Sequence, residues 1–268
     1  MEKQDHMQDD KRVSKVKERK TTVFLSAVLV VLVLLLLVIV FVMPLFEKYC
    51  YTRMKYPVYG GMNEELKDSE LYIDMKSGKS FCFLGDSITN GTAINGISWY
   101  QPLIPYIKGS ISDLSYGGWR VSDLIMEKDN IPNADIYVIA IGINDSVWNK
   151  YSFSAQTPEE YIESIGQLTE IIRTLSPDAK IYYIAPWIFF NQDEDAPQRV
   201  EQYRKALEGW CEKNGCVYIN PVPVLTDVLN KTDISKYMKD DVHPNTPDGV
   251  GLYSYAVLKA DHERKAAK

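Results

Sequence analysis

From residue 80 onward, apolar and polar residues alternate along the chain in blocks of two lengths. Short runs rich in β-branched and aromatic residues are separated by longer amphipathic stretches. Buried strands that alternate with helices of about ten or more residues are typical of a parallel sheet covered by helices on both faces. The pattern therefore predicts one three-layer α/β domain. The expected strands are 81–85, 111–118, 135–142, 181–186 and 216–220, and the amphipathic stretches are 98–108, 121–129, 159–175, 198–214 and 249–260.

A purely apolar segment precedes this domain. Residues 23–43 contain no charged side chain, and at about 1.5 Å rise per residue such a helix spans roughly 30 Å of hydrocarbon. The sequence therefore predicts a transmembrane signal anchor over residues 22–46, preceded by a tail at 1–21. Residues 47–79 are expected to form a stalk or lead-in segment, and residues 80–268 the globular domain.

The charges that flank the apolar segment predict its orientation. Lysine and arginine are more frequent before the segment than after it, and positive charge is typical of the cytoplasmic side. No small-residue cleavage site follows the segment, so an uncleaved anchor is favoured over a signal peptide. We expect a single-pass protein of the cell membrane, with a cytoplasmic N-terminus and an extracytoplasmic globular domain.

Composition narrows the possible partners and the redox chemistry. The net charge of -6 provides no general basic field for nucleic acid, so nucleic acid is not an expected partner. Four cysteines are present, and an exported domain permits disulfides. Cys211 and Cys216 fit either a local bridge or two small core residues, and we favour the core interpretation. No cysteine pair has zinc-ligand spacing with nearby histidines.

A candidate nucleophile follows the first expected strand. Gly85-Asp86-Ser87-Ile88-Thr89 places a serine hydroxyl at a strand-to-helix turn, where ligand sites of parallel sheets lie. A serine needs a base, and His243 is the one histidine outside the two terminal tails. Asp240 precedes it by three residues and is suited to orient the imidazole, with Asp241 as the competing partner. Turn chemistry and a solvated loop histidine are the alternative interpretations of these residues.

Donors for a developing oxyanion follow the next two strands. Ser115-Tyr116-Gly117-Gly118-Trp119-Arg120 forms a flexible turn whose backbone N–H groups can face a cleft. Gly142-Ile143-Asn144-Asp145 places a side-chain amide at the same edge of the sheet. Taken singly, either motif also fits a turn glycine or a helix cap.

The joint order of these motifs resembles the SGNH (GDSL) hydrolase family. The resemblance rests on GDSIT, SYGGWR, GIND and DDVHP and covers about residues 80–262. It implies a three-layer α/β/α sandwich with a parallel, flavodoxin-like sheet, ester hydrolysis through an acyl-serine, and no metal or organic cofactor. The family usually has an asparagine where this chain has Ser115, which leaves Gly117 and Gly118 as alternative donors. The implied roles are Ser87 as nucleophile and oxyanion donor, Gly118 and Asn144 as further donors, and Asp240 and His243 as the rest of the triad.

Location and nearby aromatic residues suggest the substrate. An extracytoplasmic site meets acylated carbohydrates, and Trp119 and Trp187 are candidate substrate contacts, although such residues also belong in cores. We expect hydrolysis of a short acyl ester, acetyl above all, on carbohydrate. An O-acyltransferase acting on cell-surface polysaccharide, a lysophospholipase or lipase, and a non-catalytic membrane-tethered carbohydrate-binding protein are the alternatives. Asn144-Asp145-Ser146 matches the glycan acceptor pattern, and a glycan there would block the site, so a bacterial cell surface is favoured.

Overall fold

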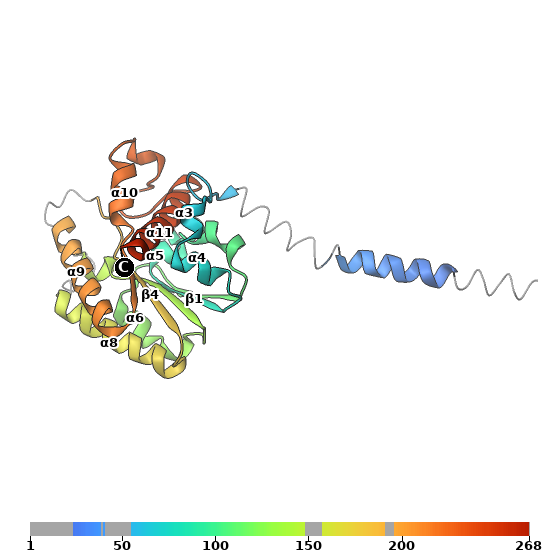
Figure 1. Cartoon of the computed structure of the whole chain (residues 1–268), viewed down its shortest axis with the longest axis horizontal. Coiled ribbons are helices and arrows are strands. Elements are labelled where there is room, and N and C mark those ends of the chain that lie inside the picture. The colour runs from blue at the N-terminus through green and yellow to red at the C-terminus, as the bar shows by residue number, and fades with distance from the viewer. Residues whose placement is uncertain (1–23, 39, 41–54, 148–156, 191–195, 268) are drawn as a thin grey trace, which may run out of the picture. The chain divides into compact units, whose positions relative to one another are not determined.

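The chain divides into two compact units, Met1–Tyr51 and Thr52–Lys268. This computed structural model describes residues 24–38, 40, 55–147, 157–190 and 196–267 (Figure 1). In the first unit residues 24–38 are helical, and their large apolar side chains are exposed. Among the residues that the structure describes, no helix is long and apolar enough to span a membrane. The expected anchor 22–46 lies partly outside the described residues. The expected tail 1–21 lies entirely outside them.

The second unit is built on one parallel sheet of five strands in the order β2-β1-β3-β4-β5. This confirms the expected parallel sheet and its flavodoxin-like order. In register, Gly85 at the end of β1 pairs with Ser115 of β2 and Ala140 of β3. The chain segments that follow these three strands therefore meet at one edge of the sheet. The strands are β1 Phe81–Gly85, β2 Ile111–Ser115, β3 Ile136–Ala140, β4 Lys180–Ile184 and β5 Val217–Ile219.

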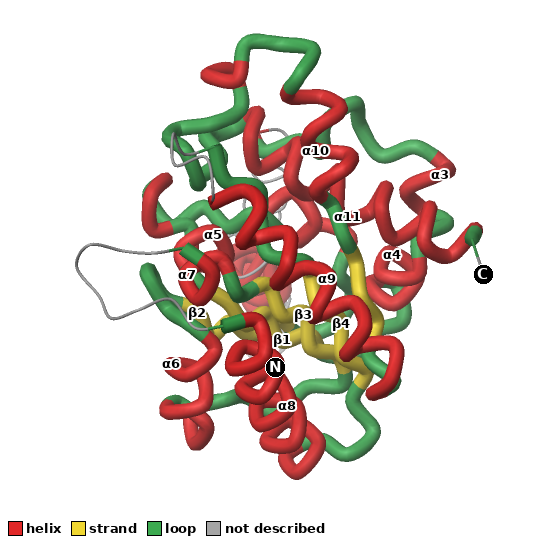
Figure 2. Tube along the Cα trace, turned by 90° about the vertical axis from the view of Figure 1, so that its left-hand side faces the viewer, coloured by secondary structure: helices red, strands yellow, loops and turns green. Residues whose placement is uncertain are grey.

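Helices cover both faces of the sheet, because successive strand side chains point to opposite faces. Phe81 and Phe83 belong to one buried cluster, whereas Cys82 and Leu84 belong to the other. The first cluster is covered by α4, α10 and α11 and the second by α6, α8 and α9, which makes the three expected layers (Figure 2). These helices are α4 Glu70–Met75, α6 Val121–Met126, α8 Pro158–Leu175, α9 Ala196–Asn214, α10 Val222–Leu229 and α11 Asp248–Ala266.

Local sequence signals set the helix boundaries. Thr157 caps α8 by accepting the backbone N–H of Glu160, whose side chain accepts the N–H of Thr157 in return, and Pro158 occupies the first turn. The remaining short elements surround the sheet edge and the loops. They are α3 Glu64–Lys67, α5 Ser87–Asn90, α7 Ile143–Ser146, η2 Thr92–Ile94, η3 Gln101–Tyr106, η4 Lys128–Asn130 and η5 Ile234–Lys236.

The globular unit begins earlier than Ser80, the start expected from the sequence. Within the expected stalk 47–79, helices α3 and α4 bury Leu66, Leu71 and Met75 in the main core cluster. The reason is that α3 and α4 contact α11, the last helix of the unit. Residues 55–79 are therefore part of the domain.

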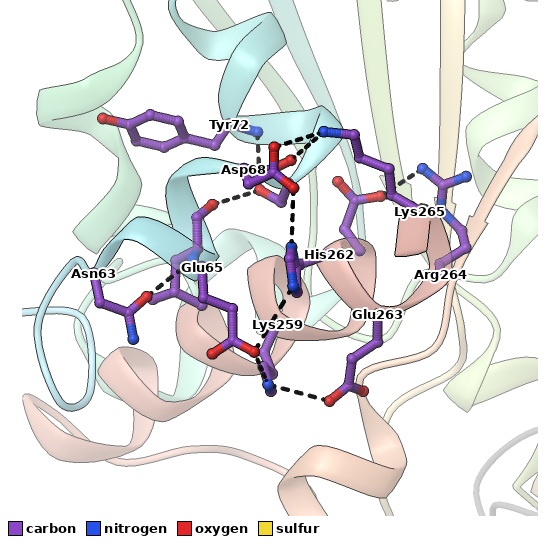
Figure 3. A network of polar contacts seen from close by, with 12 residues as sticks. Asn63, Glu65, Asp68, Tyr72, Lys259, His262, Glu263, Arg264 and Lys265 are labelled. Atoms are coloured by element: carbon purple, nitrogen blue, oxygen red, sulfur yellow. Dashed lines mark hydrogen bonds and ion pairs between the residues drawn. The ribbon is translucent and has the colours of Figure 1, made fainter. Parts of the chain in front are cut away.

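A polar network joins these first helices to α11 (Figure 3). Lys259 of α11 pairs with Glu65, and Lys265 lies 2.8 Å from a carboxylate oxygen of Asp68. His262 Nδ1 lies 3.3 Å from the other carboxylate oxygen of Asp68. Exposed ion pairs of this kind contribute little stability singly, so the buried apolar side chains dominate the attachment.

The cysteines of the second unit are free thiols. Cys82 and Cys211 are buried in the core, and Cys216 is partly buried. Cys211 therefore has the core role favoured from the sequence, whereas Cys50 lies outside the described residues.

Candidate active site

Ser87 begins helix α5 directly after strand β1 and is 9% exposed. Asp86 caps this helix, because its Oδ1 accepts the backbone N–H of Ile88 at 3.0 Å. Gly85 makes the tight turn possible: a Cβ atom there would lie 2.3 Å from Thr89 Oγ1 and 2.5 Å from the carbonyl oxygen of Ala140. Only glycine therefore allows the serine turn to approach the sheet this closely.

His243 reaches the serine from the loop before α11. Its Nε2 lies 2.8 Å from Ser87 Oγ, and its Nδ1 lies 2.9 Å from Asp240 Oδ2. The structure thus places Asp240, and not Asp241, at the imidazole. An isolated antiparallel bridge between Met238 and Pro244 closes the loop that carries both residues.

The environment of Asp240 favours its ionised form. Burial alone raises the pKa of Asp240, but hydrogen bonds from the backbone N–H groups of His243 and Val242 and from the imidazole outweigh burial and lower that pKa below its ordinary value. An ionised carboxylate at Nδ1 keeps the proton on that nitrogen, so Nε2 is free to accept the serine proton. The three side chains therefore have the arrangement of a Ser-His-Asp triad.

The glycine turn after β2 lies beside the nucleophile. The backbone N–H of Tyr116 donates to the carbonyl oxygen of Gly85 at 3.3 Å. Gly85 directly precedes Asp86 and Ser87, so this bond ties the glycine turn to the nucleophile turn. Gly118 has a φ of +82°, a left-handed conformation that glycine adopts without strain, and a Cβ there would meet open space. At Gly117 the corresponding atom would lie 3.1 Å from Thr92 Oγ1. The turn is therefore held at the sheet edge, and the choice of Gly118 over Gly117 as oxyanion donor stays a prediction.

Asn144 approaches the same turn from helix α7. Its Nδ2 donates to the carbonyl oxygen of Trp119 at 2.8 Å. A side-chain amide carries two N–H donors; one of them fixes the glycine turn, and within the described part of the chain no acceptor is found for the other. The structure thus brings Ser87, Gly118 and Asn144 to one edge of the sheet, as their positions after β1, β2 and β3 predict.

The two tryptophans expected at the substrate have different environments. Trp187 is 1% exposed and packs against Trp99 and Tyr253, with ring centroids 5.5 and 4.8 Å away. Because its ring is enclosed by the core, Trp187 is unavailable to a substrate, which corrects the sequence-based interpretation. Trp119 is partly buried and lies 5.8 Å from the ring of Tyr116, which is 64% exposed.

Three residues near the site were missed in the sequence interpretation although they lie inside its motifs. Tyr116 precedes the two glycines of the turn, and Asp86 and Asp145 directly adjoin Ser87 and Asn144. Both aspartates are completely buried. Charged residues are rarely buried without a partner, but burial is a tertiary property, and these motifs alone give no signal for it.

The fold and site define a serine hydrolase built on a parallel α/β sheet, and family comparison agrees. The model of the GDSL-like Lipase/Acylhydrolase family matches residues 83–247. The chain belongs to this family, which confirms the resemblance seen in its motifs and makes it an enzyme that acts on ester bonds.

Solved structures share the fold at low sequence identity. A GDSL-like lipase candidate from Parabacteroides merdae is 19% identical, with a TM-score of 0.59 over 70% of this chain and 98% of its own. An acetylxylan esterase from Geobacillus stearothermophilus is 20% identical, with a TM-score of 0.58 over 70% of this chain and 96% of its own.

A curated relative is also similar in sequence. An uncharacterized protein of Mycoplasma pneumoniae is 25% identical over an alignment of 154 residues, and the match covers 51% of this chain and 17% of that protein. The match therefore spans less than a fifth of that relative's length.

Proposed function

We propose that this protein is an extracytoplasmic esterase that removes O-acetyl groups from carbohydrate through an acyl-serine intermediate. The observation that carries the reaction is the hydrogen-bonded series from Asp240 through His243 to Ser87. A serine hydroxyl becomes nucleophilic when a positioned base takes its proton during attack. The series supplies that base, and Asp240 orients it.

The proposed reaction has two stages. Ser87 Oγ attacks the ester carbonyl carbon while His243 Nε2 takes the hydroxyl proton, and the C–O bond to the alcohol then breaks as His243 returns that proton to the leaving oxygen. Water next attacks the acyl carbon and gives a proton to His243, and the C–O bond to Ser87 Oγ then breaks as His243 returns that proton to Oγ. This releases acetic acid, which ionises to acetate in solution, and restores free Ser87 and neutral His243. The backbone N–H groups of Ser87 and Gly118 and the Asn144 amide stabilise the oxyanion of both stages.

Two features support carbohydrate as the alcohol component. Tyr116 and Trp119 form an aromatic pair on the glycine turn, and the Tyr116 ring is largely exposed. Tyrosine and tryptophan are enriched at binding interfaces, and a flat exposed ring can stack on the apolar face of a sugar. The acetylxylan esterase of similar fold supports the same substrate class.

The proposed location rests on the sequence. Residues 23–43 lack charge, and the basic residues before them favour a cytoplasmic N-terminus. We propose that this segment tethers the esterase outside the cell membrane. Protease added to intact cells should digest the second unit of the full-length chain. Protection of that unit would place the domain in the cytoplasm and contradict the proposed location.

The function is tested with the full-length chain and its Ser87→Ala variant. Each is assayed on p-nitrophenyl acetate, p-nitrophenyl palmitate and acetylated xylan. The proposal is supported if the native chain releases acetate, the Ser87→Ala variant does not, and the native chain cleaves p-nitrophenyl palmitate far more slowly than p-nitrophenyl acetate. Faster cleavage of palmitate indicates a lipase, and transfer of acetyl to an added sugar in preference to water indicates a transferase. Binding of polysaccharide without turnover by either chain contradicts an enzymatic role.

A further inference from the structure

Two carboxyl groups adjoin the proposed oxyanion donors along the chain. Asp86 precedes Ser87, and Asp145 follows Asn144. Both side chains are fully buried, and each has one carboxyl oxygen, Oδ2, without a hydrogen-bond partner. Among the described residues, neither group forms an ion pair. They are therefore buried acids whose charge, when present, has no direct counter-ion.

Each carboxyl group has a defined task with its other oxygen. Asp86 Oδ1 accepts the N–H of Ile88 and so shapes the nucleophile turn. Asp145 Oδ1 accepts the backbone N–H of Val121 at 3.2 Å. Val121 lies three residues after Gly118 in the chain. Asn144 holds the carbonyl oxygen of Trp119 in the same segment. Consecutive residues of α7 thus clamp the chain just after Gly118 at two points.

Full ionisation of this pair opposes the reaction that the site performs. A buried carboxylate without a counter-ion is costly, and two such charges near each other are costlier still. The oxyanion formed at Ser87 adds a third negative charge to the same region, and its stabilisation depends on local charges and dipoles. A proton on one or both carboxyl groups removes this conflict and leaves both backbone hydrogen bonds intact, because Oδ1 still accepts.

The electrostatics agree with this geometry. Burial and, to a smaller extent, the charge of Asp145 raise the pKa of Asp86, the N–H of Ile88 lowers it, and the resulting pKa is about 7. Burial likewise raises the pKa of Asp145 to about 7, against the N–H of Val121 and the charge of Arg120. Protonated forms of the pair are therefore present near neutral pH.

Other titratable groups around the two aspartates do not account for a loss of activity above neutral pH. Burial raises the pKa of Tyr203 to about 12 and raises that of Tyr161 and Tyr253 as well, so these phenols stay neutral. His243 takes the serine proton as a general base and so acts in its neutral form. The charged or titratable groups from the surrounding elements are Arg120 and Asp123 at α6, Tyr161 on α8, Arg199 and Tyr203 on α9, Tyr253 on α11, and Asp240 and His243 on the catalytic loop.

We propose that Asp86 and Asp145 are positioning residues for the oxyanion-binding backbone, and that ester hydrolysis requires at least one of their carboxyl groups to be protonated. The native enzyme then loses activity as the pH rises above neutrality. Replacement of Asp145 by asparagine keeps the acceptor for Val121 but cannot add a negative charge. Replacement by alanine removes the acceptor.

The test measures kcat and KM of the full-length chain on p-nitrophenyl acetate from about pH 5 to about pH 9, with the Ser87→Ala chain as blank. The native rate should fall at the alkaline end, and Asp145→Asn should keep most of the neutral rate without that fall. Asp145→Ala should lower kcat about tenfold or more with a smaller change in KM, because the turn is misplaced. Asp261→Asn is the matched control: Asp261 is also fully buried and accepts a backbone N–H, from Leu71, but it pairs with Arg264 away from the site.

Several outcomes overturn the inference. A native rate that stays level at alkaline pH, or the same fall in Asp145→Asn, excludes the protonation requirement. Equal losses of kcat in Asp145→Asn and Asp145→Ala exclude the positioning role. If Asp145→Ala does not fold, the comparison of the native and asparagine pH profiles still decides. The inference rests on hydrolysis at Ser87, and absence of Ser87-dependent turnover in the native chain would instead overturn the assignment of the site.

Discussion

The hydroxyl of Ser87 lies 2.8 Å from the imidazole Nε2 of His243, although 156 positions separate the two residues along the chain. The serine is fixed by the end of the first strand and the histidine by the loop before the last helix. Neither segment can provide both groups, so the reactive pair exists only when the two ends of the domain are folded together.

Loss of this imidazole should abolish turnover. We expect His243→Ala to lower kcat on p-nitrophenyl acetate by about a thousandfold or more, because the serine loses its base. His262→Gln is the control, since His262 contacts Asp68 on the opposite end of α11 from the catalytic loop. A His243→Ala chain that keeps native turnover, or an equal loss in both variants, would contradict the assignment.

The two neighbouring aspartates of the catalytic loop should behave differently. Asp240→Asn removes the charge at Nδ1 and favours the wrong imidazole tautomer, so we expect kcat to fall by about a hundredfold or more. Asp241→Asn should retain native kcat. Steady-state kinetics of the two variants compares the roles directly, and a larger loss in Asp241→Asn would reverse them.

The exposed ring of Tyr116 should contribute to the binding of carbohydrate esters and not to the hydrolysis of esters that lack a sugar. Tyr116→Ala should raise KM for acetylated xylooligosaccharides about fivefold, since stacking contacts of this size contribute roughly 1 kcal/mol. Turnover of p-nitrophenyl acetate, which has no sugar, should change little. Tyr116→Trp keeps a flat ring and serves as the control. A similar loss on both substrates would show that Tyr116 supports the turn and not the sugar.

Burial of Asp86 should make stability depend on pH. Its pKa rises from the ordinary value of 3.8 to about 7 on folding. Between these values the folded state binds more protons than the unfolded state, so the free energy of unfolding falls as pH rises through this range and is level above it. Asp86→Asn should weaken that slope in urea unfolding measured at several pH values. An unchanged slope would mean that another group is responsible.

The early helices should contribute to the stability of the whole unit. Leu71 of α4 is 1% exposed, and Leu71→Ala should lower the free energy of unfolding by about 2–5 kcal/mol. Ile73 of the same helix is 50% exposed, and Ile73→Ala should change it by less than about 0.5 kcal/mol. Chemical denaturation of both variants gives the comparison. Equal effects would place α4 outside the cooperative unit.

The alternation of short apolar runs with longer amphipathic stretches was sufficient to predict the sheet, and the motifs after its strands predicted the residues that meet at its edge. Ser87, Gly118 and Asn144 each follow a strand, and parallel strands bring their carboxyl ends together. Burial could not be predicted in the same way. Trp187 is enclosed by rings from Trp99 and Tyr253, which are distant in sequence.

Short helices were equally hard to recognise. Helices α3 and α4 have four and six residues, too few to show a helical period, and their apolar residues are interrupted by polar ones. Only their contact with α11 reveals that they belong to the domain. Tertiary contacts, which no local pattern encodes, therefore account for the misplaced domain start.

The docking of α3 and α4 on α11 also has a consequence for biosynthesis. These helices leave the ribosome before the strands of the unit, and their partner α11 is the last described helix of the unit to be synthesised. Until α11 emerges, Leu66 and Leu71 have no complete apolar surface to cover them, and the loop that carries the catalytic base is still without its flanking helix. We therefore expect a nascent chain to lack turnover, and to expose the apolar side chains of α3 and α4, until α11 has left the ribosome.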